Sequence, residues 1–517
     1  MRDIVPLLYR HGIPEPDREA KYYADAVLLK PPERILSLLI SSRIEEASHC
    51  VLPPGSDMLH TGFAHYPADS SLRDHKLLLH DGDAGELARA CESQLHKLVF
   101  RDSPAHHHCT RLQLNGDYVI PGGRFRELYY WDCYFASLGL NVLGRRNLSS
   151  QLSSHLVQCT ERIGYPPNGA RTYFTTRSQP PLLSSLLRNA WPQDLNDERV
   201  FHALEMEHAR LLSKPHCVHL ESGGTELFRY VDSSSQKRLE CLFADSESIK
   251  GLDDSSASRK LQCTRSACAS GWDFSSRWID GNGRDAAAEI ASCDLHSFVL
   301  LLERNIAALL RERRPNNYAE RAERYDHLAR KRLRNLSRMH WDGSKWTDLQ
   351  FFGISADGST ASIASSFGDE HSLYVSSWIP LACGACDGDP NHAGKAINAF
   401  QCSNFLDESG PKASTVMSGE QWDDPNVWPP LVWLLVQGIS LYNSEVAHEI
   451  VTPFLRSLLA FWRRYGTLPE KLASFGEAGF GGEYESQTGF AWTAGVALAL
   501  LSDRYDCSVK ELYQYER

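Results

Sequence analysis

The chain has 517 residues, of which 42% are hydrophobic and 23% charged, as in an ordinary soluble globular protein. Its formal net charge of -11 argues against a general nucleic-acid binder, which needs a basic face. The acidity identifies no partner and suits a neutral substrate, because such a substrate needs no electrostatic steering.

The N-terminus lacks the pattern of a secretion signal. Asp3, Pro6 and Arg10 interrupt any apolar segment, and no small-residue cleavage site follows them. The most apolar stretch, residues 431–436, is too short to cross a bilayer. We therefore expect a soluble cytoplasmic protein without membrane contact, and we expect its fourteen cysteines to be free thiols.

Helical periodicity dominates the rest of the chain. Six segments carry apolar residues at three- and four-residue spacing, and a seventh is apolar nearly all round, as in a buried inner helix. In chain order these segments are 84–100, 198–212, 285–313, 318–339, 429–442, 446–465 and 492–501. No run of alternating strand residues and no βαβ rhythm is found between them.

No polar low-complexity linker marks a domain boundary. We therefore expect one large all-helical catalytic domain over residues 1–517, in which residues 1–12 form a short tail. On the pattern alone, a helical toroid and a helical-repeat solenoid both remain open.

Five clusters in the predicted loops concentrate Trp, Asp, Glu, Arg, Asn and Gln. They span residues 121–132, 165–181, 270–278, 421–428 and 470–484. Carboxylates, amides and guanidinium groups bind paired sugar hydroxyls, and Trp offers a flat apolar face to a pyranose ring. Glycosidic cleavage needs one carboxylic acid and a second carboxylate. The composition thus favours a carbohydrate site, although any single Trp–Asp pair can equally be a helix cap with core packing.

Four of these clusters resemble motifs of the trehalase family. PGGRFRELYYWDCY (121–134) is similar to the first family signature, and QWDDPNVWPP (421–430) is similar to the second. ASGWDFSSRW (269–278) matches the catalytic-acid motif, and 482–496 resembles the lid and the last inner helix. KYYADAV (21–27) resembles the N-terminal block, so the resemblance extends from about residue 13 to about residue 503.

The resemblance implies an all-α (α/α)6 toroid, with six inner and six outer helices and a pocket at one end. It also implies inverting hydrolysis of α,α-trehalose to two glucose molecules, with Asp273 as general acid and Glu470 as general base. The family needs no metal, and we expect no cofactor. We also expect a monomer whose binding partner is the disaccharide. The implied sugar-binding positions are Arg124, Trp131, Asp132, Asn168, Arg177, Ser178, Gln179, Arg238, Glu240, Gly271 and Glu483, and we expect Trp422 and Asp423 to line the same pocket.

Local sequence alone would assign the two carboxylates differently. Asp273 would be a helix N-cap or an ion-pair partner of Arg277, and Glu470 an exposed residue that begins a loop. Glu483 is a rival for the base because its motif is the more conspicuous, but the motif spacing assigns Glu483 to substrate hydroxyls. A pocket that excludes water would raise the pKa of Asp273 and nearby arginines would lower it, so the direction is not fixed by sequence.

Three departures from the family pattern lie in loops and spare both carboxylates. Leu239 replaces the usual proline between Arg238 and Glu240, which loosens that loop. Val427 replaces a glycine, and valine is strained there if the position needs a positive φ. The stretch before Glu483 is poorer in glycine than in the family, which would stiffen a lid.

The other motifs predict neither a metal nor a redox site. Adjacent side chains in His106–His108 point in different directions, Cys383–Cys386 lacks a second pair, and Asp387–Asp389 lacks the rest of a calcium loop. Two alternative functions remain. One is another (α/α)6 α-glucosidase, and the other is a catalytically inactive sugar-binding or regulatory protein on the same scaffold.

Overall fold

The computed structural model describes residues 3–15, 18–41, 43–54, 56–64, 82–102, 109–232, 234–313, 318–367, 372–387 and 389–502. Among them, six helices form a closed ring in which each helix packs against the next and the last packs against the first. The ring consists, in order, of α6 (Tyr130–Val142), α8 (Leu183–Asn189), α12 (Cys293–Arg313), α14 (Ile379–Ala382), α16 (Pro429–Ser440) and α18 (Ala491–Leu501).

A second layer of helices covers the outside of this ring. Within it α5 packs against α18, α7 against α6, α9 and α13 against α12, and α17 against α16. The outer helices are α5 (Asp83–Lys97), α7 (Arg146–Ile163), α9 (Asp197–Leu211), α13 (Ala319–Met339), α15 (Pro390–Gln401) and α17 (Ser444–Tyr465). The two concentric layers confirm the predicted (α/α)6 toroid, and the closed ring excludes a solenoid.

Inner and outer helices differ in sequence because their surroundings differ. All residues of α18 are buried, so this inner helix is apolar around its whole circumference. The outer helix α17 buries one face only. It begins after Asn443, whose side chain accepts hydrogen bonds from the N–H groups of Glu445 and Val446, and ends at Gly466 with φ 65°.

Periodicity locates seven of the helices but misses others of similar length. The helix predicted over 285–313 begins only at Cys293, because a 3₁₀ turn (Ala287–Glu289) and a short strand precede it. The pattern does not predict α6, α7 or α8, nor α11 (Asp254–Ser270) or α10 (Leu242–Ser248). α11 is rich in serine, which weakens its apolar signal.

Small antiparallel and mixed sheets, which the sequence pattern did not indicate, join the helices. The largest has the strand order β7-β6-β10-β9-β8. Its strands are β6 (Cys217–Leu220), β7 (Glu226–Phe228), β8 (Ile290–Ala291), β9 (Leu349–Phe352) and β10 (Thr360–Ser366). Other pairings within the described residues join β1 (Val27–Leu28) to β2 (Val51–Leu52), β3 (Met58–His60) through β4 (Val99–Asp102) to β5 (Asp117–Val119), and β11 (Leu406–Asp407) to β12 (Gly410–Pro411). Most of these strands have two to four residues, too few for an alternating pattern to be recognised.

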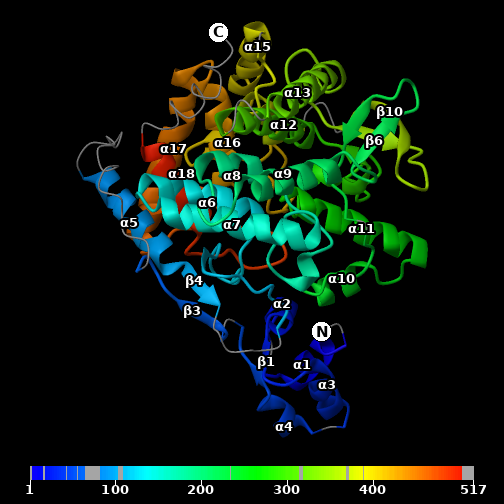
Figure 1. The fold of residues 1–517 in the computed structure, drawn as a ribbon, viewed down its shortest axis with the longest axis vertical. Helices are drawn as coiled ribbons and strands as arrows, with labels where there is room; N and C mark the ends of the chain where they lie inside the picture. The colour runs from blue at the N-terminus through cyan, green and yellow to red at the C-terminus, as the bar shows by residue number, and fades with distance from the viewer. Residues whose placement is uncertain are drawn as a thin grey trace.

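The described residues between 4 and 52 form a small unit at one end of the toroid, which we call the N-terminal lobe (blue in Figure 1). It contains α1 (Val5–His11), α2 (Ala20–Ala24), α3 (Pro32–Ile40), α4 (Ile44–Ser48) and the β1-β2 pair. These elements enclose a hydrophobic core of their own, which also includes Leu239 from the toroid. The division into one catalytic domain and a tail over 1–12 stays a prediction.

No described helix has both the length and the apolar character that spanning a membrane requires.

The inner helices α6 and α18 approach each other closely at Gly139 and Gly495. A β-carbon on Gly495 would lie 2.1 Å from the carbonyl oxygen of Phe135. Gly495→Ala should therefore force the helices apart and lower the free energy of unfolding by about 1–3 kcal/mol. Thermal unfolding measures the loss. Gly394→Ala in α15 is the matched control, because its β-carbon meets open space and alanine favours a helix; equal midpoints for the two variants would contradict the close approach.

Candidate active site

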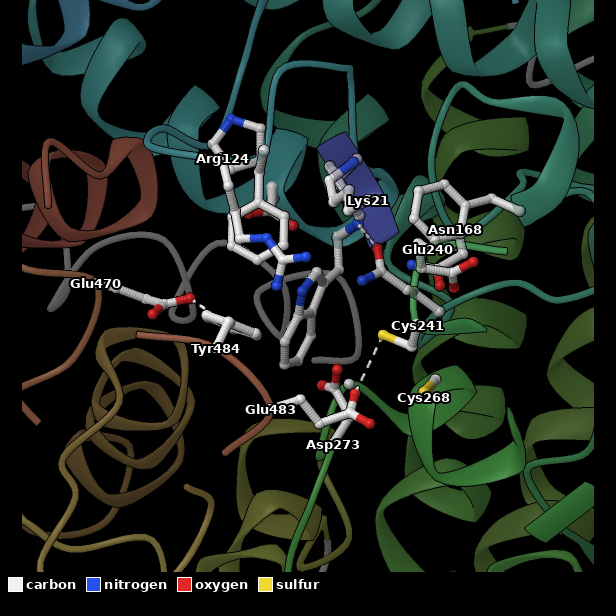
Figure 2. A pocket seen from close by; sticks show the side chains of 18 of the residues that line it. Lys21, Arg124, Asn168, Glu240, Cys241, Cys268, Asp273, Glu470, Glu483 and Tyr484 are labelled. Atoms are coloured by element: carbon white, nitrogen blue, oxygen red, sulfur yellow. Dashed lines mark hydrogen bonds between the residues drawn. The ribbon is translucent and has the colours of Figure 1, made fainter. Parts of the chain in front are cut away.

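One pocket collects side chains from loops that lie far apart in the sequence (Figure 2). Its space measures about 730 Å³, including the open mouth. Of the predicted site residues it is lined by Arg124, Trp131, Asp132, Asn168, Arg177, Gln179, Arg238, Glu240, Gly271, Asp273, Trp422, Glu470 and Glu483. The ring explains this convergence, because the connections between successive inner helices meet at the same end.

Two of the predicted residues, Ser178 and Asp423, do not line the pocket. Ser178 donates its hydroxyl to a backbone carbonyl at 2.6 Å. Asp423 is fully buried and accepts hydrogen bonds from Ser275 Oγ at 2.8 Å and from the N–H of Ser276 at 2.7 Å. Asp423 therefore fixes the segment that follows Asp273.

The end of α11 delivers Asp273 to the pocket. The helix stops at Gly271, whose φ of 81° is left-handed. A β-carbon at this position would lie 2.8 Å from the Trp131 indole ring. Glycine is thus needed both for the turn and for the close approach of the backbone to Trp131.

Other residues take the structural roles that local sequence offered to Asp273. Ser275 caps the 3₁₀ helix Ser276–Trp278 by accepting a hydrogen bond from the N–H of Arg277. The guanidinium group of Arg277 is buried and pairs with Asp294 at 2.9 Å and Asp348 at 2.8 Å. The Asp273 carboxyl is consequently left to the pocket.

Burial, followed by the negative charge of Glu483, raises the pKa of Asp273 to about 7. Arg238 and Arg177 lower this pKa by less, so burial outweighs the arginines, which the sequence could not decide. A third carboxyl, Asp132, has a pKa well above its usual range, first through burial and then through the charges of Glu470 and Asp273. The pocket therefore holds several carboxyls that disfavour one another's ionisation.

Glu470 is buried, contrary to the exposed loop residue that its local sequence suggests. Its N–H donates to the carbonyl of Gln487 at 2.9 Å. Two residues later, Leu472 and Val427 exchange backbone hydrogen bonds of 2.8 and 3.0 Å in an isolated β-bridge. Val427 thus pairs as a strand residue does, which suits a β-branched side chain, and it helps to hold the segment that carries Glu470.

Three neighbouring groups contact the Glu470 carboxylate. The hydroxyl of Tyr484 donates to Oε1 at 2.9 Å (Figure 2). The N–H of Gln487 donates to Oε2 at 3.4 Å, and Lys471 Nζ lies 3.7 Å from the same oxygen. Burial raises the pKa of Glu470, whereas the Lys471 charge and the Tyr484 hydrogen bond lower it. Lys471 also donates to the side-chain oxygen of Gln421 at 2.8 Å, and the Gln421 amide donates to the carbonyl of Asp273. A hydrogen-bonded chain therefore links the backbone at Asp273 to the residue next to Glu470.

Hydrogen bonds fix the polar side chains of the pocket wall, but some of their polar atoms have no hydrogen-bond partner. Arg177 donates to Asn168 Oδ1 at 2.8 Å and to Glu240 Oε1 at 2.7 Å. Within the described residues, Arg177 Nη1, Glu240 Oε2 and Trp422 Nε1 are buried without a hydrogen-bond partner. Buried polar atoms are normally paired, so these three indicate a polar ligand with hydroxyl or amide groups.

Stacked indole rings form an apolar side of the pocket. Trp422 lies parallel to Trp428 with ring centroids 3.7 Å apart, and Trp272 also stacks on Trp422, with ring centroids 5.5 Å apart. Trp131 and Trp492 meet edge to face at 6.1 Å. Such a cluster offers a rigid apolar surface beside the hydrogen-bonding groups, which is the combination that a pyranose ring requires.

An ion pair joins the segment before α18 to the opposite wall. Arg238 donates to both carboxylate oxygens of Glu483 at 2.8 and 2.6 Å, and also binds Asp245 through its Nε at 3.1 Å. Cys241 lies beside this pair, with its Sγ 3.5 Å from Glu483 (Figure 2). Glu483 thereby closes the pocket next to Asp273.

Sequence reasoning missed several lining residues. They are Lys21, Pro121, Phe125, Tyr129, Phe174, Cys241, Cys268, Trp428, Tyr484, Phe490 and Trp492. Tyr484, Trp428 and Trp492 lie inside recognised motifs, so their positions were available as a signal. Cys241 and Cys268 carried no such signal, because nothing in their local sequence points to a site.

The other motifs form no metal centre in the described residues, where no cluster of three or more His, Cys, Asp or Glu is placed to hold an ion. Asp389 instead caps α15 by accepting a hydrogen bond from the N–H of His392. His106–His108 and Gly388 lie outside the described residues.

Comparison with known proteins gives one consistent family. The family model described as Trehalase matches residues 62–504. The chain is 31% identical over 423 residues to the probable trehalase of Oryza sativa subsp. japonica, across 76% of this chain and 73% of the relative. It is 32% identical over 424 residues to the periplasmic trehalase of Xanthomonas axonopodis pv. citri (strain 306), across 78% and 71%.

A solved structure supports the same fold. The neutral trehalase Nth1 from Saccharomyces cerevisiae superimposes with a TM-score of 0.61 at 19% identity, across 77% of this chain and 75% of that one. At this level of identity the likeness concerns the fold alone.

Proposed function

Because this chain belongs to the trehalase family, we propose that it hydrolyses α,α-trehalose to two glucose molecules with inversion of configuration. In this proposal Asp273 is the general acid and Glu470 the general base. The observation that carries it is a pocket lined by a buried Glu470 and a half-buried Asp273, together with polar groups that lack hydrogen-bond partners and with stacked indoles. The relatives' names supply the substrate.

Asp273 is suited to give a proton to the glycosidic oxygen. Its pKa of about 7 keeps the carboxyl largely protonated in weak acid. As the bond from the anomeric carbon to the oxygen breaks, the proton moves from Asp273 to that oxygen, and the first glucose leaves.

Glu470 is suited to take a proton from water. Lys471 and Tyr484 favour its ionised form against the effect of burial. Tyr484 donates to Oε1 at 2.9 Å, whereas the N–H of Gln487 reaches Oε2 only at 3.4 Å. Oε2 is therefore the more weakly bound oxygen, and in this proposal it accepts the water proton while the water oxygen bonds to the anomeric carbon. An inverting reaction needs this water on the face opposite the leaving group, with the carboxyls roughly 6.5–9.5 Å apart.

The remaining wall residues would orient the sugar. Arg177, Glu240 and Trp422 present the three unpaired polar atoms to hydroxyls, and Glu483 adds a carboxylate from the closing segment. The arginines pair with carboxylates, which keeps their charge from opposing the oxocarbenium character of the transition state.

The decisive experiment follows fresh products by proton NMR. Purified protein is incubated with trehalose, maltose and sucrose in separate reactions. We expect glucose from trehalose only, with α- and β-anomers appearing initially in equal amounts. Activity on maltose or sucrose instead would favour another α-glucosidase, no cleavage would favour an inactive sugar-binding protein, and α-glucose alone would contradict inversion.

A monomeric state and a cytoplasmic location also stay proposals. Similar bacterial relatives are named periplasmic trehalases, which argues against the cytoplasmic assignment. Light scattering of the purified protein and fractionation of its native cells would decide the two questions.

Removing either carboxylate should abolish turnover and spare folding. We expect Asp273→Asn and Glu470→Gln each to lower kcat by roughly 10²–10⁴-fold, the usual contribution of a general acid or base. Thermal unfolding verifies the fold of each variant. Glu485→Gln, on an exposed side chain of the same segment as Glu483, is the control and should retain wild-type turnover. Near-normal turnover of either variant would refute the role assigned to that residue.

The pKa of Asp273 fixes the alkaline side of the pH profile. Since the acid must be protonated, kcat/KM should fall about tenfold per pH unit above pH 7. Glu483→Gln removes a charge that raises this pKa and releases Arg238, which lowers it, so the descent should move to lower pH. Profiles of kcat/KM for the wild type, Glu483→Gln and Glu485→Gln test this, and an unmoved descent in Glu483→Gln would contradict the assignment.

A further inference from the structure

We propose that the N-terminal lobe is a positioning element of the active site. It holds Arg124 and the segment Arg238–Phe243, which includes the start of α10, against the pocket, and it thereby sets how tightly the sugar binds. The inference rests on the proposed function for its kinetic part. The lobe precedes residue 62, where the match to the family model begins, so the match itself assigns it no role.

The first contact is an apolar anchor. Leu239 stands between two residues that line the pocket, Arg238 and Glu240, yet its own side chain is 7% exposed and belongs to the hydrophobic core of the lobe. Four residues on, the Phe243 ring lies 4.3 Å from the ring of Tyr9 in α1. Leu239, where the family has a proline, thus provides an apolar side chain that packs into the lobe and anchors the segment Arg238–Phe243 to it.

The second contact is a buried charge network. Lys21 lines the pocket and is 2% exposed. Its Nζ donates to Asp25 Oδ2 at 2.7 Å, to Glu127 Oε1 at 2.7 Å and to the Tyr173 hydroxyl at 3.2 Å. Glu127 in turn accepts from Arg171 at 2.8 Å. Buried charges of this kind tolerate little displacement, so the lobe is fixed to the segment between Arg124 and Trp131.

The third contact leads to the proposed base. Glu19 Oε1 lies 2.8 Å from Arg124 Nε. The guanidinium group of Arg124 stands over the Tyr484 ring, 4.7 Å from its centroid, and Tyr484 donates to Glu470. A displacement of the lobe would therefore move Arg124 in the sugar-binding wall and Tyr484, which orients the proposed base.

A matched pair of variants at Leu239 tests the anchor. Leu239→Asn removes the apolar contact at similar size, whereas Leu239→Met keeps it. We expect Leu239→Asn to raise KM for trehalose about tenfold with a smaller fall in kcat, because it misplaces binding groups. Leu239→Met should retain the wild-type KM. Lys21→Met should resemble Leu239→Asn, and Ile40→Ser, on a lobe side chain that is 70% exposed, should leave both constants unchanged.

Hydrogen–deuterium exchange gives a readout that needs no catalysis. Backbone amides of residues 238–243 should exchange faster in Leu239→Asn than in the wild type, Leu239→Met or Ile40→Ser. Two results would overturn the inference. One is an unchanged exchange rate for residues 238–243 in Leu239→Asn, and the other is a wild-type KM in an active Leu239→Asn enzyme. If the wild-type protein does not cleave trehalose, the proposed function fails, and the exchange experiment alone decides whether the lobe positions this segment.

Discussion

Charged and polar side chains buried around the pocket form ion pairs and hydrogen bonds with one another, because little water reaches them. The geometry of the site depends on this pairing. Arg177 meets Glu240 and Asn168, Arg238 meets Asp245 and Glu483, and each pairing fixes a side chain that would otherwise be flexible. Pairing lowers the pKa of Glu240 although burial opposes it. Among the described residues the Asp273 carboxyl has no comparable ion-pair partner, and its pKa rises. The same low-polarity surroundings therefore produce both rigid carboxylates and a protonated one.

The toroid supplies the rigidity that such pairing requires. Because the six inner helices close on themselves, the loops at their ends cannot move independently, and short contacts become possible. Gly271 beside Trp131 and Gly495 beside α6 show how little space is left. Segments of the toroid between residues 121 and 492 consequently meet at one pocket, at distances that allow hydrogen bonds, which a flexible assembly would not maintain.

The two loop departures that sequence comparison marks as risks have structural explanations. Val427 lies in a β-bridge with Leu472, where a β-branched residue is favoured, and this bridge supports Glu470. Leu239 enters the core of the N-terminal lobe. Val427 stands where the family has a glycine, so its loop loses conformational freedom. Leu239 stands where the family has a proline, and its apolar side chain anchors its segment to the N-terminal lobe.

The sequence by itself determined seven of the helices, the motif clusters and most of the residues that line the pocket, because helical spacing and ordered motifs are local properties of the chain. It did not determine the short strands, or that Asp423 binds Ser275 and Ser276 instead of lining the pocket. It also could not decide whether burial or arginine charge controls the pKa of Asp273, nor show that Cys241 and Cys268 line the pocket. These features depend on distances between residues that are remote in the chain. Only the closed ring fixes those distances, and with them the burial and charge that each side chain experiences.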